Sequence, residues 1–343
     1  MKPLSFAFIA CNKNPQRFRA DPSYIYRCEN LALALQMQGH QIEMLHYTQI
    51  KDFGQYDVAI FHRPVYGLLF RWYLSKLRRQ GCILVADVDD LIFAPEYAHV
   101  SPGVVNNLVS LRQTEKNFHA NAKALACFDK FTTSTLPLQQ KLLQHFPKSQ
   151  VLLLPNTVHC NWLSTKQFAT NTEHKILTYF PGTRSHDRDF ASIAPALAEF
   201  LHENKEVQLH ITGVLNANLH CRAEQLVLNA KVSFEQYPHA VANSWVNLAP
   251  LEYNEFNQHK SGIKAIEAAF FGAPTLATPI PDMHRLADCG ALLVDDPTDW
   301  FNQLSMLCQT SYYQQHSFQL REKILAKANI QQQSQNFIKY AGF

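Results

Sequence analysis

The sequence predicts an α/β fold made of two domains, each with a parallel β-sheet covered by helices. In both halves of the chain, short and fully apolar segments alternate with longer segments of helical periodicity. Strands that are buried on both faces have this composition. The chain has 343 residues, enough for two domains of ordinary size. A polar stretch without periodicity, 156–174, is the expected linker between them.

The first half shows the strand–helix alternation of a parallel sheet. Its strands are expected at 4–10, 42–45, 58–61, 83–86, 130–134 and 151–154. Its helices are expected at 24–38, 66–80, 104–126 and 137–145. Gly39 follows the first helix, where a left-handed residue commonly ends a helix. This order predicts one sheet with helices on both faces.

The second half repeats the pattern. Its strands are expected at 176–180, 207–212, 232–234, 246–249, 275–277 and 292–294. One helix should end near residue 203, and another should run from about 261 to Gly272, its C-cap. Between Pro297 and Gly342 there is neither Gly nor Pro, so we expect helix almost to the end of the chain.

Composition excludes several classes of protein. Apolar residues make up 47% and charged residues 17% of the chain, which is typical of a well-packed globular protein. A net charge of +3 does not by itself indicate nucleic-acid binding. The eight cysteines form no Cys-x-x-Cys pair, so we expect reduced thiols and a cytoplasmic protein. The N-terminal apolar run predicts a strand rather than a signal peptide, and no segment has the length of a membrane span.

The strongest functional signal lies in the segment 246–278, which has the form strand, polar loop, helix, strand. Ligands bind at the carboxyl ends of strands in such sheets. Lys260 and Ser261 stand where the helix begins, so a cation and helix N–H groups can meet an anion. Lys264 and Glu267 add a second cation and a carboxylate that suits a sugar hydroxyl. The alternative is an amphipathic crossover helix with a solvated Lys and Glu face.

A second phosphate-binding turn is predicted after the strand at 176–180, in the sequence FPGTRSHDRDF. It combines backbone N–H groups at a helix start with basic side chains. The candidate residues are Gly182, Thr183, Arg184, His186, Asp187 and Arg188. The alternative is an ordinary turn in which Asp187 caps the helix and the arginines are solvated. Two such loops at the same end of one sheet favour a phosphate site.

The stretch KSGIKAIEAAFFGAPTLAT resembles the donor-binding segment of retaining GT-B glycosyltransferases of the family-4-like type, also called glycosyltransferase group 1. In that family a Lys-Ser pair, a second Lys and a helix Glu precede a Gly-x-Pro strand start. The turn at Gly182 is similar to one that lines the family's donor cleft. The resemblance implies a GT-B fold, with two Rossmann-like domains facing each other across a cleft and a helical C-terminus.

The resemblance also implies residue roles. Lys260 and Ser261 would lie near the donor diphosphate, and Glu267 would bind the ribose of the nucleotide. Family members carry an earlier Glu that contacts the donor sugar, whereas this chain has Gln258 and His259 at those positions, with Glu255 nearby.

The implied reaction moves a sugar from a nucleotide-diphosphate sugar to an acceptor, with retention and without a metal or other cofactor. The expected acceptor is a surface polysaccharide or a lipid-linked glycan intermediate. We expect Lys260 and Arg188 to stabilise the leaving diphosphate. The expected domain limits are 1–160 for the acceptor domain and 175–310 for the donor domain. The helices of 311–343 should pack back on the first domain.

The segment VADVDDLIF places Asp87, Asp89 and Asp90 at the carboxyl end of a buried strand. An Asp-x-Asp metal site of the GT-A glycosyltransferase type is one alternative, but it needs a single-domain architecture, which the two halves contradict. A phosphohydrolase of the haloacid-dehalogenase type is another, but it needs an Asp-x-Asp followed by Thr after the first strand, whereas here Asp90-Leu91 follows the expected fourth strand. A structural turn is another alternative. The favoured interpretation is a cleft-facing acceptor motif in which Asp89 or Asp90 orients the acceptor hydroxyl.

Two further hypotheses concern partners. The stretch Arg63–Arg79 is basic, aromatic and free of acidic residues, so it could contact anionic lipid, although packing with a solvated basic edge is an alternative. The sixteen histidines show no metal-ligand spacing, so we expect no metal. Because the early Glu is absent, a degenerate GT-B protein that binds a nucleotide or glycan without transfer is the alternative function.

Overall fold

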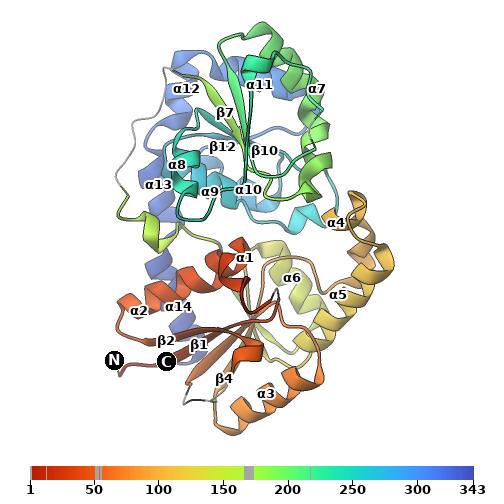
Figure 1. Ribbon diagram of the computed structural model, residues 1–343. Helices are drawn as coiled ribbons and strands as arrows, with labels where there is room; N and C mark the ends of the chain where they lie inside the picture. Colours follow the sequence, from red (N-terminus) through yellow and green to blue (C-terminus); the bar gives the residue numbers. More distant parts are fainter. Residues whose placement is uncertain (1, 13, 51–53, 55, 166–173, 217) are drawn as a thin grey trace. The chain divides into compact units, whose positions relative to one another are not determined.

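The structure is a computed structural model that describes residues 2–12, 14–50, 54, 56–165, 174–216 and 218–343. Its residues form two compact units. Unit 1 contains 1–98, 111–164 and 329–343, and unit 2 contains 99–110 and 165–328. The predicted α/β fold with two parallel sheets is confirmed (Figure 1).

Unit 1 contains a sheet of six parallel strands in the order β2-β1-β3-β4-β5-β6. The strands are β1 (Ser5–Ala10), β2 (Gln41–His46), β3 (Val58–His62), β4 (Ile83–Val88), β5 (Lys130–Thr133) and β6 (Gln150–Leu153). Because all strands are parallel, their carboxyl ends meet at one edge. The loops after β1, β3 and β4 therefore lie at that edge.

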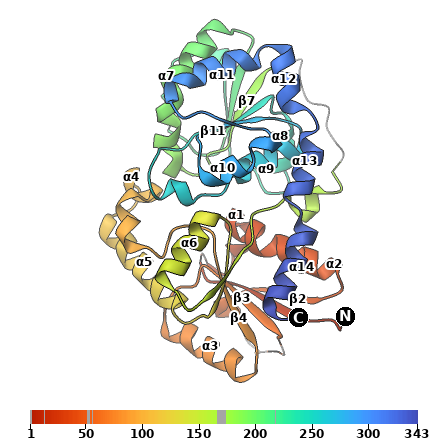
Figure 2. The same cartoon turned by 180° about the vertical axis from the view of Figure 1, so that it is seen from behind.

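Helices cover both faces of the unit 1 sheet (Figure 2). They are α1 (Pro22–Tyr24), a π-helical turn (Ile25–Glu29), α2 (Asn30–Met37), α3 (Leu68–Arg79), α5 (Leu111–Leu125), α6 (Leu136–His145) and α14 (Ile330–Ala341). Phe6 and Phe8 of β1 pack in one core with α2 and with Phe337 of α14. Phe61 of β3 packs instead against Phe70 of α3. Side chains that alternate along these strands therefore pack against helices on opposite faces of the sheet.

Unit 2 contains a second six-stranded parallel sheet, in the order β12-β11-β10-β7-β8-β9. Its strands are β7 (Ile176–Tyr179), β8 (Gln208–Thr212), β9 (Leu226–Asn229), β10 (Val246–Ala249), β11 (Thr275–Ala277) and β12 (Ala291–Leu293). Its helices are α4 (Pro102–Val105), α7 (Asp187–Glu203), α8 (Tyr237–Ala242), α9 (Ile263–Phe270), α10 (Pro281–Arg285), α11 (Trp300–Leu307), α12 (Thr310–Ser317) and α13 (Leu320–Lys327). Trp245 stacks on Tyr313 of α12, which fixes that helix to this unit.

Two predicted elements are wrong. The segment 232–234, expected to be a strand, is a loop and turn. The strand at this place in the chain is β9, which lies earlier, at Leu226–Asn229. Both segments are short apolar runs, but the ladder with β8 pairs Leu209 with Leu226. The helix expected at 104–126 is interrupted: α4 ends at Val105, Asn107 has a left-handed φ of 56°, and α5 starts at Leu111.

The C-terminal segment is helical as predicted, but it consists of separate helices. Gln319 has a φ of 53° between α12 and α13, and Asn329 caps α14 with its side chain. The segment 311–343 is divided between the units, because 311–328 belong to unit 2 and 329–343 to unit 1. Of the expected linker 156–174, the part 166–173 lies outside the described residues.

Candidate functional site

The predicted turn after β7 lies at the carboxyl edge of the unit 2 sheet. Gly182 has a φ of +74°, a conformation that favours glycine. A short 3-10 turn (Arg184–His186) follows, and α7 begins directly after it. The loop after β8 approaches closely, because a Cβ added to Gly213 would lie 3.2 Å from the Gly182 nitrogen. The absence of a side chain at Gly213 therefore allows these neighbouring loops to pack together.

Asp189, in the first turn of α7, connects the loop after β7 with the loop after β10. Its carboxylate accepts a hydrogen bond from His186 Nδ1 at 2.8 Å and from the Glu252 backbone N–H at 2.8 Å. Burial alone would raise the pKa of Asp189, but the bond from His186 and the nearby charge of Lys260 are among the effects that hold this pKa below its ordinary value. Asp189 is thus a buried, ionised carboxylate at the centre of the site.

His186 is the uncharged partner in this arrangement. Burial, and then the positive charges of Lys264 and Lys260, lower the pKa of His186, although Asp189 opposes this shift. The imidazole is therefore neutral at neutral pH. Since Nδ1–H donates to Asp189, Nε2 carries the lone pair and can accept a hydrogen bond from a ligand hydroxyl.

The two predicted lysines lie close to aromatic rings and to the Asp189 carboxylate. Lys260 Nζ is 5.4 Å from the centroid of the Phe256 ring, and Lys264 Nζ is 5.0 Å from that of Tyr179. Burial lowers the pKa of Lys264 to about 8, even though Asp189 raises it. Both lysines are only half-buried, so a ligand can reach them.

The start of α9 differs from the prediction in one respect. One of the backbone N–H groups at this helix start, that of Gly262, is not free for an anion, because it donates to Asp282 Oδ2 at 2.7 Å. Asp282 also accepts a hydrogen bond from Arg285 Nε at 2.6 Å. A Cβ on Gly262 would lie 2.7 Å from Leu286 Cδ1, which shows how closely α9 and α10 approach. Ser261 is half-buried beside this contact.

Glu267 lies in the second turn of α9 and is 5% exposed. Its Oε2 accepts a hydrogen bond from the Tyr237 hydroxyl at 2.8 Å. Burial, together with the charge of Glu267, raises the pKa of Tyr237 well above its ordinary value, so the phenol remains a donor. Sequence reasoning missed Tyr237, which lies in α8 about thirty residues before its partner.

The positions where the resembled family has its early Glu carry no carboxylate. His259 is 4% exposed and its Nδ1 donates to the Glu255 carbonyl at 2.7 Å, so it fixes the loop conformation. Gln258 is half-buried. Glu255 itself is exposed.

The remaining predicted residues of the turn after β7 form hydrogen bonds or ion pairs with neighbouring side chains at the surface. Arg184 Nε lies 3.1 Å from Asp187, and Arg188 Nη2 lies 2.7 Å from Glu252. The Thr183 hydroxyl bonds to Ser185 at 2.7 Å. Arg188 therefore lies beside the loop that follows β10, with its charge already engaged by Glu252.

Residues 99–110 add a contact that the sequence did not predict. Asn106 Oδ1 accepts the Arg188 backbone N–H at 3.1 Å, and Asn106 Nδ2 donates to the Ser185 carbonyl at 2.8 Å. The first half of the chain thus supplies a residue that holds the turn before α7. No local pattern distinguishes Asn106, since its partners are about eighty residues away.

In unit 1, Asp87 is buried and fully engaged. Its carboxylate accepts hydrogen bonds from Arg27 Nη2 at 2.7 Å, from His62 Nδ1 at 2.8 Å and from the Thr132 hydroxyl at 2.7 Å. Burial would raise the pKa of Asp87, but Arg27 and His62 hold it below its ordinary value. With its side chain 2% exposed, Asp87 is not placed to act as the nucleophile of a phosphohydrolase.

Asp89 and Asp90 follow β4 at the carboxyl edge of the same sheet. Asp89 Oδ1 accepts from Arg63 Nε at 2.6 Å, and Asp90 Oδ2 lies 3.9 Å from the same guanidinium. Burial opposes ionisation of Asp89, but Arg63 and His62 hold its pKa well below its ordinary value. Asp89 therefore remains available as a charged hydrogen-bond acceptor, and Asp90 lies beside the same guanidinium.

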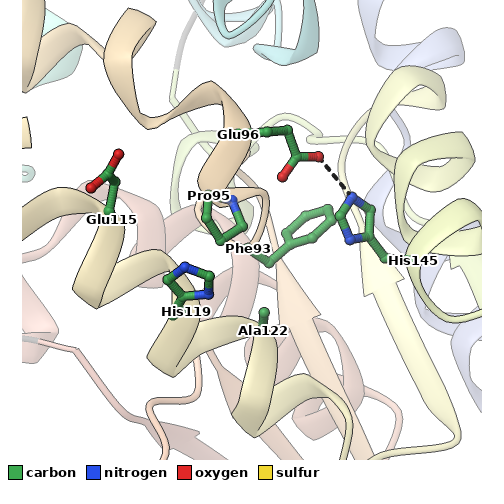
Figure 3. A pocket seen from close by; sticks show the side chains of 7 residues that line it. All are labelled: Phe93, Pro95, Glu96, Glu115, His119, Ala122 and His145. Carbon is green, nitrogen blue, oxygen red and sulfur yellow. Dashed lines mark ion pairs between the residues drawn. The ribbon is translucent and has the colours of Figure 1, made fainter. Parts of the chain in front are cut away.

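A hollow of about 570 Å³ lies elsewhere in unit 1. Figure 3 shows Glu115 and His119 of α5 on one side and Glu96 and His145 on the other, with Phe93 beside His145. The His145 and Glu96 side chains form an ion pair at 3.2 Å. None of the predicted site residues lines this hollow.

Helix α3 was predicted to contact lipid, but one of the aromatic side chains on which that hypothesis rests is buried. Phe70 is 2% exposed and packs against Phe61, so it is not available to a membrane. Leu68 and Trp72 are 86% and 48% exposed, respectively. The exposed basic residues of the helix are Arg71, Lys76, Arg78 and Arg79.

Metal-binding clusters and membrane-spanning helices are both absent from the residues that the structure describes. Within the described part of the chain, no group of three or more His, Cys, Asp or Glu residues could hold a metal ion. No helix among the described residues is long and apolar enough to cross a membrane.

No family model matches the sequence, and no curated protein matches it. Similar solved structures exist. WaaG, a glycosyltransferase involved in lipopolysaccharide biosynthesis, is 13% identical with a TM-score of 0.64, over 99% of both chains. Anabaena Alr3699/HepE, solved with UDP-glucose, is 10% identical with a TM-score of 0.65, over 98% of this chain and 99% of that one. The chain has the GT-B fold.

Another GT-B structure is larger than this chain. S. aureus TarM, solved with UDP, is 12% identical with a TM-score of 0.60, and the match covers 87% of this chain but only 58% of TarM. A Listeria monocytogenes protein assigned as a UDP-N-acetylglucosamine 2-epimerase has a TM-score of 0.58 at 12% identity. At such identities the similarity establishes the fold. The function has to be argued from the site.

Proposed function

We propose that the protein transfers a sugar from a nucleotide-diphosphate sugar to a glycan or lipid-linked acceptor. The observation that carries this proposal is the grouping of Lys260, Lys264 and His186 around the ionised Asp189, at the carboxyl edge of the second sheet of a GT-B fold. Ligands bind at this edge in open α/β sheets. Two cations and a neutral imidazole suit a diphosphate and a sugar hydroxyl.

In this proposal, unit 2 binds the donor and catalysis is electrostatic. Lys260 and Lys264 would stabilise the charge that develops on the leaving diphosphate, and His186 Nε2 would accept a hydrogen bond from the sugar. Glu267, held by Tyr237, would accept hydrogen bonds from the ribose. Two fixed cations can do the work that a metal does elsewhere, which supports a metal-independent reaction. The resemblance of KSGIKAIE supports hexosyl transfer with retention.

Unit 1 would bind the acceptor. Asp89 and Asp90 provide ionic hydrogen-bond acceptors at the carboxyl edge of its sheet. Such groups suit the hydroxyls of a glycan. A cytoplasmic location, at the inner face of the membrane when the acceptor is lipid-linked, belongs to the same proposal.

The alternative is a GT-B protein that binds a nucleotide or glycan without transferring a sugar. The loop at Gln258 and His259 favours it, because no carboxylate stands where the resembled family contacts the donor sugar. A nucleotide-binding panel followed by donor-hydrolysis and transfer assays separates the two functions. Nucleotide binding without hydrolysis or transfer of any donor would favour the alternative.

The affinity for nucleotide should depend on pH through Lys264. Its charge is lost as the pH rises through its pKa of about 8, because burial disfavours the protonated form. We therefore expect the Kd for the preferred nucleoside diphosphate to increase from neutral pH to about pH 9. The Lys264→Arg variant should lose this dependence, since Arg stays charged. An identical pH profile for both proteins would exclude Lys264 from the phosphate contact.

Peripheral membrane contact through α3 is a further part of the proposal, supported by exposed Leu68 and Trp72 beside basic residues. Each basic residue near an anionic surface contributes about 1 kcal/mol. Reversing the charge of Arg71 and Arg79 should therefore weaken sedimentation with anionic liposomes at least about tenfold. Arg78 is left intact because its Nη2 donates to the Cys127 carbonyl at 2.8 Å.

The matched control reverses two exposed basic residues of unit 2, Lys205 and Lys231. This control should sediment like the wild type, and donor hydrolysis should be the same in all three proteins. If the wild type does not sediment with anionic liposomes at low salt, α3 is an ordinary packed helix with a solvated basic edge.

A further inference from the structure

Four side chains form a hydrogen-bonded row at the carboxyl edge of the unit 1 sheet. Ser23 lies in α1, His62 ends β3, and Asp87 and Asp89 lie in β4 and the turn after it. The Ser23 hydroxyl is 2.8 Å from His62 Nε2, and His62 Nδ1 is 2.8 Å from Asp87 Oδ2. The same hydroxyl is 2.5 Å from Asp89 Oδ2. The row thus has the order of a Ser-His-Asp triad with a second carboxylate added.

The hydrogen bonds define where the protons lie. Asp89 is ionised and accepts from Arg63 as well, so the Ser23 hydroxyl proton must point to Asp89. The Ser23 oxygen can then only accept from His62, which requires a proton on Nε2. Asp87 is also ionised, so His62 Nδ1 must donate to it. In this arrangement His62 donates from both ring nitrogens.

Charge balance supports this assignment. The three carboxylates of the cluster, Asp87, Asp89 and Asp90, outnumber its two guanidinium groups, those of Arg27 and Arg63. A neutral His62 would leave the cluster with an unbalanced negative charge and one hydrogen bond short. Both losses are costly at a side chain that is 0% exposed.

The same assignment excludes a nucleophilic triad. In a triad the histidine uses a lone pair on Nε2 to take the serine proton. Here Nε2 carries a proton, and the serine proton is directed at Asp89. Ser23 is therefore a hydrogen-bonding residue and not a nucleophile.

We propose that Ser23, His62 and Asp87 are positioning residues that keep Asp89 ionised and oriented toward a hydroxyl of the glycan acceptor. This inference rests on the proposed function. Each oxygen of Asp89 has one of the partners named above, Arg63 on Oδ1 and Ser23 on Oδ2, and a carboxylate oxygen can accept two hydrogen bonds. The Asp89 side chain is 11% exposed, whereas Asp87 is 2% exposed, so a hydroxyl can reach only the former.

The first test measures the His62 ring without any reaction. Long-range proton–nitrogen NMR of the full chain, assigned with a His62→Gln variant, should show both ring nitrogens protonated at neutral pH. A neutral ring with one unprotonated nitrogen would overturn the proposal even if sugar transfer is observed. Covalent labelling of Ser23 by a fluorophosphonate probe would also overturn it, because that reaction needs a nucleophilic serine.

The second test separates positioning from general structural support. Ser23→Ala should raise the KM for the acceptor roughly ten- to hundredfold, the effect of losing one hydrogen bond to a charged group. Ser23→Thr keeps the hydroxyl and should stay close to the wild type. The nucleotide Kd should not change in either variant. An equal loss in both variants, or an unchanged acceptor KM in Ser23→Ala, would contradict the positioning role. Absence of transfer in the wild type would refute the proposed function and leave the NMR result standing.

Discussion

Replacing Lys260 with alanine should lower the turnover of sugar transfer by about 10²-fold at saturating donor. Lys260 supplies a fixed positive charge at the start of α9, close enough to Asp189 and His186 to affect the pKa of both. In the proposed reaction this charge is used when the diphosphate leaves, so its loss should reduce kcat and not only donor affinity. The measurement is steady-state transfer with the preferred donor.

The matched control is Lys205→Ala, an exposed lysine of the same unit. It should keep the wild-type kcat. If Lys260→Ala turns over at the wild-type rate with saturating donor, Lys260 does not stabilise the leaving group. A rise in KM alone would assign it to donor binding.

Replacing Asp87 with alanine should lower the free energy of unfolding by about 3–5 kcal/mol. The change leaves the Arg27 guanidinium buried without its carboxylate partner and removes acceptors from His62 and Thr132. Because the pKa of Asp87 is held below its ordinary value, its contribution is present at neutral pH. It is lost as the pH falls below about 4 and through the lower pKa of the folded state. Denaturant unfolding at neutral pH measures the effect.

Asp129→Ala is the control for this prediction, because Asp129 is an exposed residue of the same unit. Its effect should stay within about 0.5 kcal/mol. A loss below about 1 kcal/mol for Asp87→Ala would mean that the buried cluster relaxes or fills with water, and that it does not hold the sheet edge rigidly.

Most of the fold could be predicted because its strands are buried and parallel. Such strands are short apolar runs, and 275–277 is predicted with the observed limits. The wrong predictions of strands and helices lie where the local sequence pattern does not determine the structure. The run 226–234 contains two candidate strands, and only pairing with β8 selects the first. The helix expected at 104–126 is broken because Asn107 adopts a left-handed conformation, which an Asn tolerates but does not require.

The candidate site could be predicted only in part. Lys260, Lys264 and Glu267 stand out by their spacing at the start of a helix, and the structure gathers both lysines near Asp189. The residues that organise the site are different. Asp189 connects to Glu252, sixty-three residues later. Contacts across such distances depend on the order of strands in the sheet, which the pattern of a single sequence does not determine.

Calorimetric titration of the wild type with UDP, GDP, CMP and dTDP tests the central claim most directly, because every proposed role of unit 2 depends on nucleotide binding. The account predicts that one nucleotide binds the full chain at a single site, that Lys260→Ala and Lys264→Ala weaken this binding, and that Lys205→Ala does not. Absence of binding by all four nucleotides to a folded wild-type chain would contradict it, as would binding that neither site variant weakens.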